Sequence, residues 1–263
     1  MTRLIHLSDL HFGRVRADLT RPLIEVVNRL AGDLVIVSGD FTQRARNSQF
    51  RAARAFLDRI EAPTLSVPGN HDTPLDNLWV RFTRPFSRYR THVDEELEPE
   101  WQDGTVRVVG INTVTPWYWQ RGRFRGHARR RVAARLGEIM DSHIGVAVMH
   151  HPLEQAPEVD KELMKGSSKA LSQLSQAGAD VVLSGHLHNA SAAPFEAAPG
   201  ILFVQAGTGL STRVRAEPNS FNVLDIAGDE IAVERWAAFD DPSFSAVGGE
   251  RFRWDGTHWR AVG

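Results

Sequence analysis

The sequence contains no cysteine among its 263 residues. Disulfide bonds, thiolate metal ligands and cysteine nucleophiles are therefore excluded. Lysine is also scarce, because every basic residue is arginine except Lys161, Lys165 and Lys169. We interpret that scarcity as a compositional bias rather than a functional signal. A net charge of -1 gives no general attraction to nucleic acid or to acidic membranes.

Long hydrophobic runs are absent as well. No segment approaches the roughly 20 apolar residues that span a bilayer, and we expect no transmembrane segment. The first residues are typical of a strand interrupted by Asp9 and lack the apolar core of a signal peptide. The hydrophobic content of 42% and charged content of 24% are those of a soluble globular protein. We expect a cytoplasmic protein with one domain over residues 1–263, because no repeat or linker divides it.

The first third of the chain alternates apolar runs with amphipathic segments. Residues 4–7, 34–38 and 64–67 are typical of buried strands. The first helix is expected to be capped by Thr20, with Pro22 in its first turn. The second is expected to begin near Asn47. Successive strand-loop-helix units predict parallel strands with crossover helices.

The remainder is less regular. Residues 75–104 are interpreted as a covering segment. Strands are expected at residues 106–111, 144–149 and 181–183, and helices at residues 128–140 and 168–177. Helical periodicity is absent after residue 200, and we expect antiparallel strands over residues 201–263. These comprise a meander of residues 201–205, 221–226 and 231–239, followed by a hairpin of residues 252–254 and 258–262.

Polar residues that can bind metal follow five of the expected strands. They are Asp9-Leu10-His11, Gly39-Asp40, Gly69-Asn70-His71, His150-His151 and Gly185-His186-Leu187-His188. Alternate residues of an extended segment point to the same side, so Asp-x-His and His-x-His can each provide two ligands. Any one pair alone is common in surfaces and cores. The whole set of imidazoles, carboxylates and an amide is too large for one tetrahedral ion and suits two transition-metal ions that share a carboxylate.

In this order the motifs Asp-x-His, Gly-Asp, Gly-Asn-His-Asp, His-His-Pro and Gly-His-x-His resemble those of the calcineurin-like metallophosphoesterases. The small bacterial class III cyclic-nucleotide phosphodiesterase-like enzymes are nearest in size. The motifs extend over residues 9–188. The resemblance implies an α/β fold in which two mixed β-sheets pack face to face with helices on the outside.

The resemblance also implies two divalent or trivalent metal ions, manganese, iron or zinc. The implied ligands are Asp9, His11, Asp40 and His188 for one ion, and Asp40, Asn70, His150 and His186 for the other, with Asp40 bridging. His151 is expected to support a ligand rather than to be one.

Two such ions, roughly 3.5–4 Å apart, would supply a hydroxide in line with phosphorus and would neutralise charge on the phosphoryl oxygens. His71, when protonated, would donate to the leaving oxygen, with Asp72 holding its imidazole. Candidate substrate contacts are Arg44, Trp117, Trp119 and Arg213.

The leading hypothesis is a phosphodiesterase acting on a small phosphodiester or cyclic nucleotide. A nucleotide-lipid pyrophosphatase stays open because residues 75–86 can supply an apolar lid, and a phosphomonoesterase stays open too. A nuclease is disfavoured, because it needs a basic stripe, and we expect no stable nucleic-acid complex. A non-catalytic scaffold predicts lost ligands, and none is lost. The sequence leaves the oligomeric state open, a homodimer included.

Overall fold

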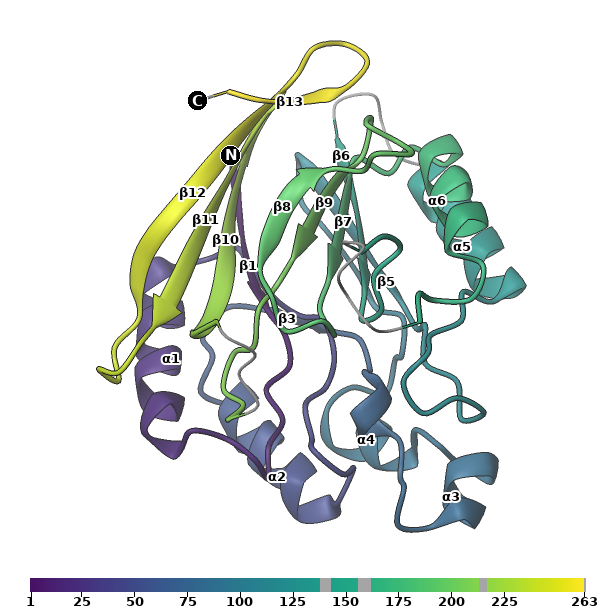
Figure 1. Cartoon of the computed structure of the whole chain (residues 1–263), viewed down its shortest axis with the longest axis vertical. Helices are drawn as coiled ribbons and strands as arrows, with labels where there is room; N and C mark the ends of the chain where they lie inside the picture. Colours follow the sequence, from purple (N-terminus) through teal and green to yellow (C-terminus); the bar gives the residue numbers. More distant parts are fainter. Residues whose placement is uncertain (138–142, 156–161, 213–216, 263) are drawn as a thin grey trace.

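Two β-sheets face each other, and helices cover the outer side of each (Figure 1). The computed structural model describes residues 1–137, 143–155, 162–212 and 217–262. The predicted fold class, two mixed sheets with helices on the outside, is confirmed. No helix in this part of the chain combines the length and apolarity needed to cross a membrane.

The first sheet has seven strands in the order β13-β12-β11-β10-β1-β2-β3. Their bounds are β1 (Thr2–Leu7), β2 (Leu34–Val37), β3 (Thr64–Ser66), β10 (Asn219–Ala227), β11 (Glu230–Ala238), β12 (Ser245–Trp254) and β13 (Trp259–Ala261). β1, β2 and β3 are parallel, whereas the other pairings are antiparallel. The crossover helices are α1 (Ala17–Leu30) and α2 (Asn47–Leu57).

The second sheet has six strands in the order β4-β5-β6-β7-β9-β8. Their bounds are β4 (Glu100–Gln102), β5 (Val106–Ile111), β6 (Ile144–Met149), β7 (Val181–Ser184), β8 (Ser191–Pro194) and β9 (Leu202–Gln205). The four central strands are parallel, and β4 and β8 are antiparallel edges. The helices α5 (Gly126–Gly137) and α6 (Ser167–Gln176) lie against this sheet.

Three apolar layers hold the sandwich together. Leu4, Val108 and Val148 belong to the layer between the sheets. A second layer packs α1 and α2 against the first sheet, and a third packs α5 and α6 against the second. Because both faces of the central strands are covered, those strands are almost continuously apolar, as the sequence indicates.

The first helix begins earlier than predicted. It starts at Ala17 rather than after Thr20. Leu19 is fully buried, and the guanidinium of Arg16 donates to Asp18 over 2.9 Å. Packing therefore adds a turn that the capping pattern does not reveal. Pro22 lies inside the helix, where it removes one backbone hydrogen bond.

Residues 201–205 do not belong to the predicted meander. The strand β9 is in the second sheet, parallel to β7, and pairs on its other side with β8. β8 has the sequence SAAP, which carries no β-branched or aromatic residue, so propensity gives no sign of it. The antiparallel run consists of β10 to β13, and its last two strands form the predicted hairpin.

The covering segment over residues 75–104 contains two short helices, α3 (Leu78–Thr83) and α4 (Ser87–His92), and then β4. The predicted helix over residues 128–140 is found as α5, and residues 138–140 of that prediction lie outside the described residues.

Candidate metal centre

The carboxyl ends of β1, β2 and β3 meet those of β6 and β7 at one edge of the sandwich. The loops behind these strands carry the predicted ligands and bring them together. Each is buried, with an exposed fraction of 6% or less: Asp9, His11, Asp40, Asn70, His150, His186 and His188. Ligands are expected at this edge because parallel strands end there.

The first group of donor atoms comes from the loops after β1 and β7. Nε2 of His188 lies 3.0 Å from Oδ1 of Asp9. Nε2 of His11 lies 3.5 Å from the same oxygen and 3.4 Å from Nε2 of His188. Ligand atoms about 2.0–2.2 Å from one ion lie roughly 3.0–3.6 Å from each other. The spacing of these three atoms therefore fits one metal ion.

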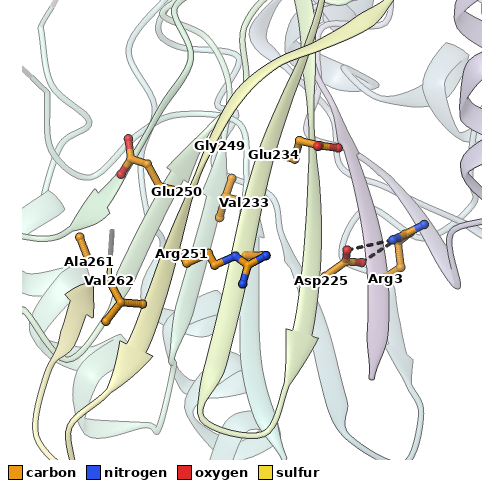
Figure 2. A pocket seen from close by; sticks show the side chains of 10 residues that line it. Arg3, Asp225, Val233, Glu234, Gly249, Glu250, Arg251, Ala261 and Val262 are labelled. Atoms are coloured by element: carbon orange, nitrogen blue, oxygen red, sulfur yellow. Dashed lines mark hydrogen bonds and ion pairs between the residues drawn. The ribbon is translucent and has the colours of Figure 1, made fainter.

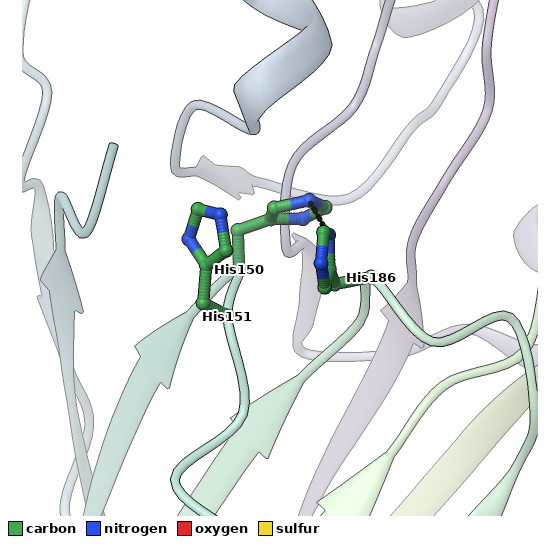
Figure 3. Close-up of side chains that lie close together, drawn as sticks. All are labelled: His150, His151 and His186. Atoms are coloured by element: carbon green, nitrogen blue, oxygen red, sulfur yellow. Dashed lines mark hydrogen bonds between the residues drawn. The ribbon is translucent and has the colours of Figure 1, made fainter. Parts of the chain in front are cut away.

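The second group comes from both sheets. Nε2 of His150 lies 3.1 Å from Oδ1 of Asn70 and 3.2 Å from Nδ1 of His186 (Figure 3). Nδ1 of His150 donates to the carbonyl oxygen of Ser38 over 2.8 Å. That bond fixes the orientation of the ring and leaves Nε2 directed at the group.

Asp40 lies between the two groups. Its Oδ2 is 3.6 Å from Nε2 of His11 and 3.5 Å from Nε2 of His150. Its Oδ1 accepts the backbone N–H of His71 over 2.8 Å. One carboxylate oxygen thus faces both groups, and the other is held by the backbone.

The residues fit a cation because their charges are buried and incompletely satisfied. Burial alone would raise the pKa of Asp40, but His150 and His71 hold it well below its usual range. Burial opposes charge on His150 too, yet Asp40 and Asp9 raise its pKa to about 9. Within the described structure, Oδ1 of the fully buried Asp9 has no donor besides the imidazoles of its own group, those of His188 and His11.

Five of the ligand positions have a backbone that L-residues rarely adopt. The φ values are 53° at Asp9, 50° at His11, 55° at Asp40, 74° at His186 and 67° at His188. Strained backbone of this kind gathers at functional sites.

Two glycines allow the loops to approach each other. A Cβ at Gly69 would overlap the backbone nitrogen of Asp40, and one at Gly185 would overlap the hydroxyl of Ser8. Ser8 in turn donates to Oδ2 of Asp9 over 2.7 Å. The sequence predicts Asp9 from the Asp-x-His motif, but nothing in the sequence predicts that Ser8 supports it.

His71 lies next to the first group, with its ring 4.9 Å from that of His11. The expectation that Asp72 holds this imidazole differs from what is found. Nδ1 of His71 is 2.9 Å from the carbonyl oxygen of Gln43. The Asp72 carboxylate instead accepts backbone N–H groups of Phe41, Thr42 and Gly69 over 2.9–3.2 Å. Asp72 therefore joins the Asp40 loop to the Gly69 turn.

Burial and the charge of Asp40 raise the pKa of Asp72 to about 7, although the backbone donors oppose the shift. The carboxyl group is fully buried.

Arg81 was not singled out from the sequence, because segment 75–104 has no periodic pattern. It is 1% exposed and donates to the carbonyl oxygens of Pro116 (2.8 Å) and Tyr118 (2.9 Å) and to the hydroxyl of Thr73 (2.8 Å). The next carbonyl along that loop, of Trp119, accepts the side-chain amide of Asn70 over 3.2 Å. Arg81 thus fastens the loop that orients the Asn70 amide.

The remaining candidates lie around these groups. His151 is buried, with Nδ1 2.8 Å from the hydroxyl of Thr113, and it is close to His150 and His186 (Figure 3). Trp117 and Trp119 are 73% and 65% exposed, and Arg44 is exposed on the Asp40 loop. Arg213 lies outside the described residues.

A groove of about 490 Å³ lies elsewhere, on β10, β11 and β12 and the neighbouring strands of the first sheet (Figure 2). Arg3 and Asp225 at its edge are already paired at 2.7 Å. It contains none of the predicted ligands, so the chemistry is expected at the strand ends and not there.

Comparison with known proteins shows the family to which the fold belongs. The family model described as calcineurin-like phosphoesterase matches residues 2–190. A probable cyclic nucleotide phosphodiesterase of Synechococcus sp. is 25% identical over 199 residues, covering 71% of this chain and 73% of that protein. The glycerophosphodiester phosphodiesterase GpdQ of Enterobacter lignolyticus is 26% identical over 160 residues, covering 57% of this chain and 56% of GpdQ.

Among solved structures, a dimetal phosphatase from Danio rerio superposes with a TM-score of 0.70. The match covers 94% of this chain and 98% of that one at 13% identity, which establishes the likeness of fold.

Proposed function

The chain belongs to the calcineurin-like phosphoesterase family, and from that premise we propose that it is a dinuclear metal-dependent phosphodiesterase of small phosphodiesters, cyclic nucleotides among them. Family membership and phosphodiesterase-named relatives make it a phosphoric ester hydrolase. The observation that carries the dinuclear proposal is the position of Asp40 Oδ2, 3.6 Å from one group of ligands and 3.5 Å from the other.

We propose two sets of ligands, which the short distances between their donor atoms support. One ion would be held by Asp9, His11, Asp40 and His188, and the other by Asp40, Asn70, His150 and His186. Mixed nitrogen and oxygen ligands suit manganese, iron or zinc. When bound, two such ions supply an activated water-derived nucleophile and neutralise charge on the phosphoryl oxygens.

His71 is proposed as the proton donor to the leaving oxygen. Its Nδ1 is 2.9 Å from the carbonyl oxygen of Gln43, which can only accept, so that nitrogen carries a proton. Nε2 is then the nitrogen that holds or releases a proton toward substrate. Its ring lies 4.9 Å from that of His11, and this closeness to a proposed ligand supports a role at the leaving oxygen.

The remaining parts of the site keep this arrangement rigid. Asp72 binds the backbone of both loops that carry Asp40 and Asn70, and Ser38 fixes the ring of His150. Residues 1–263 are proposed to act as one domain, because β10 to β13 complete the sheet that carries the first three ligand loops.

The test is a substrate panel on metal-replete protein. We expect turnover of bis-p-nitrophenyl phosphate and of 2′,3′- or 3′,5′-cyclic nucleotides to exceed that of p-nitrophenyl phosphate, UDP-linked lipid and single-stranded DNA. Asp40→Asn is the matched inactive variant, since it keeps the shape of the side chain and removes the shared charge. Equal activity of Asp40→Asn and wild type, or a preference for monoesters, would contradict the proposal.

A further inference from the structure

An exposed apolar surface lies beside the metal centre and includes Trp117 and Trp119, two of the candidate substrate contacts. Five of the eight exposed large hydrophobic side chains in the described structure belong to it. They are Leu78 (58% exposed), Trp79 (78%), Phe82 (46%), Trp117 (73%) and Trp119 (65%). We call this set the aromatic shelf.

Three members of the shelf, Leu78, Trp79 and Phe82, lie on α3, and contacts hold Phe82, Trp117 and Trp119 in place. Leu78 and Phe82 are one turn apart on α3, and the Phe82 ring is 5.0 Å from that of Trp117. The guanidinium of Arg81 lies 5.9 Å from the centre of the Trp119 ring. Arg81 also donates to two carbonyl oxygens of the loop that carries Trp117 and Trp119. These hydrogen bonds fix the backbone from which the two indoles project.

The size of the shelf exceeds what one small planar ligand needs. An aromatic side chain offers about 200 Å², so the exposed fractions amount to on the order of 600 Å² of apolar surface. The largest apolar patch of a typical monomer is about 300–600 Å² and is often functional. A single nucleobase covers the face of one indole.

The shelf also begins at the metal centre. The carbonyl oxygen of Trp119 is 3.2 Å from the Asn70 amide, so one end of the shelf touches a proposed ligand. Two exposed guanidinium groups, of Arg44 and Arg84, form no ion pair with any other described residue. Arg84 directly follows α3, and Arg44 follows the carbonyl that holds His71.

We propose that the aromatic shelf binds the apolar part of an amphiphilic phosphodiester at a lipid surface, so that a phospholipid-type diester is a substrate of the adjacent centre. This substrate class rests on the proposed function. A molecule that satisfies both features must join a phosphodiester to an extended apolar group. Exposed indoles suit the boundary between water and acyl chains, and unpaired guanidinium groups suit anionic headgroups.

The binding test uses the whole metal-replete protein and vesicles of phosphatidylcholine with phosphatidylglycerol. Wild type should sediment with the vesicles. Trp79→Ser should weaken partitioning by about tenfold or more, because it removes an inserting apolar side chain. Arg84→Ser should weaken it about fivefold on anionic vesicles at low salt and leave neutral vesicles unaffected. The matched control is Phe239→Ser, since Phe239 is 58% exposed but outside the shelf, and it should bind as wild type does.

The activity test compares a lysophospholipid diester in mixed micelles with bis-p-nitrophenyl phosphate. Trp79→Ser should lose about tenfold in kcat/KM on the lipid and stay within about twofold of wild type on the soluble diester. Retained activity on the soluble diester also shows that the variant is folded.

Two results would overturn the inference. One is vesicle binding that is absent, or that is the same for wild type, Trp79→Ser and Phe239→Ser. The other is a cyclic-nucleotide KM that rises in Trp117→Ala without any change in vesicle binding. That result would mean that the shelf stacks against a nucleobase instead of binding lipid. Vesicle binding that depends on the shelf, without hydrolysis of any diester, would support binding of the shelf to lipid and contradict the proposed phosphodiesterase function.

Discussion

His71 is the ionisable residue beside the ligand groups whose imidazole is oriented by a backbone carbonyl. As a proton donor it should matter most when the leaving alcohol is poor. His71→Ala is expected to lose roughly 10²–10⁴-fold in kcat on an alkyl or nucleoside diester. The loss should be smaller on a p-nitrophenyl diester, because that leaving group needs little protonation. Metal content measured by elemental analysis should stay near wild type. Equal losses on the two substrates would assign His71 a positioning role.

Arg81 supports the site from a distance through the loop that carries Trp119. Arg81→Met leaves the carbonyl oxygens of Pro116 and Tyr118 without their donors, and each unsatisfied buried group costs about 1–3 kcal/mol. We expect thermal stability to fall. We also expect the ion at Asn70 to bind more weakly than the ion at Asp9, as measured by metal titration with elemental analysis.

Arg81→Lys is the conservative control for that prediction. It should restore little, because an ammonium cannot bind several acceptors with the fixed fork of a guanidinium. A uniform drop in affinity at both sites would instead indicate a general loss of structure.

At the residue scale the sequence predicts which side chains can bind metal better than it predicts the backbone groups that orient them. Asp9, His11 and Asp40 could be named because each carries metal-binding atoms at a strand end. The carbonyl groups of Ser38 and Gln43 fix His150 and His71, but every residue has a carbonyl, so no pattern distinguishes these two. The role expected of Asp72 failed for the same reason, because its partners are backbone N–H groups.

Among the elements, those with continuous apolar runs were predictable and the short edge strands were not. β5, β6 and β7 are buried on both faces, and strands buried in this way consist almost entirely of apolar residues. β8 lies at an edge, where pairing with β9 rather than side-chain burial defines it. The parallel pairing of β9 with β7 cannot be predicted from the residues of β9 either, because it depends on where the chain returns to the sheet.

One pH effect belongs to the junction of β6 and β7, at their amino ends. Oδ2 of Asp180 accepts the backbone N–H of Gly145 over 2.7 Å. Burial raises the pKa of Asp180 from 3.8 to about 6, although this bond opposes the shift. Because the folded state holds this proton more tightly than the unfolded state, the contribution of Asp180 to stability is fully present below pH 3.8. That contribution is lost as the pH rises through 6.

Asp180→Asn keeps an acceptor and removes the charge. Relative to this variant, the free energy of unfolding of wild type should fall by about 2 kcal/mol between pH 4 and pH 7. Urea unfolding of both proteins in chelator measures the difference without a contribution from bound metal. Parallel stability curves would show that Asp180 ionises normally in the folded protein.

The whole molecule should be stabilised by metal, because the ligands come from both sheets. Binding an ion at a hundred times its dissociation constant adds about 2.7 kcal/mol. Two ions should therefore raise the Tm by about 10 °C or more in a chain of this size. Scanning calorimetry before and after chelation measures the change. Asp40→Asn should respond much less, and a chelator that leaves the wild-type Tm unchanged would argue against occupied sites.

The position of β1 has a consequence for how the protein is made. β1 is synthesised before both of its neighbours, yet it lies in the middle of its sheet, between β2 and β10. Its register with β10, in which Leu4 faces Leu224, cannot form until most of the chain has been synthesised. All the proposed ligands emerge by residue 188, and during the remaining synthesis the first strand has one open edge. The nascent chain should therefore carry an exposed edge of β1 until β10 is translated. Completion of the first sheet therefore waits for β10 to β13, although β1, β2 and β3 can pair earlier.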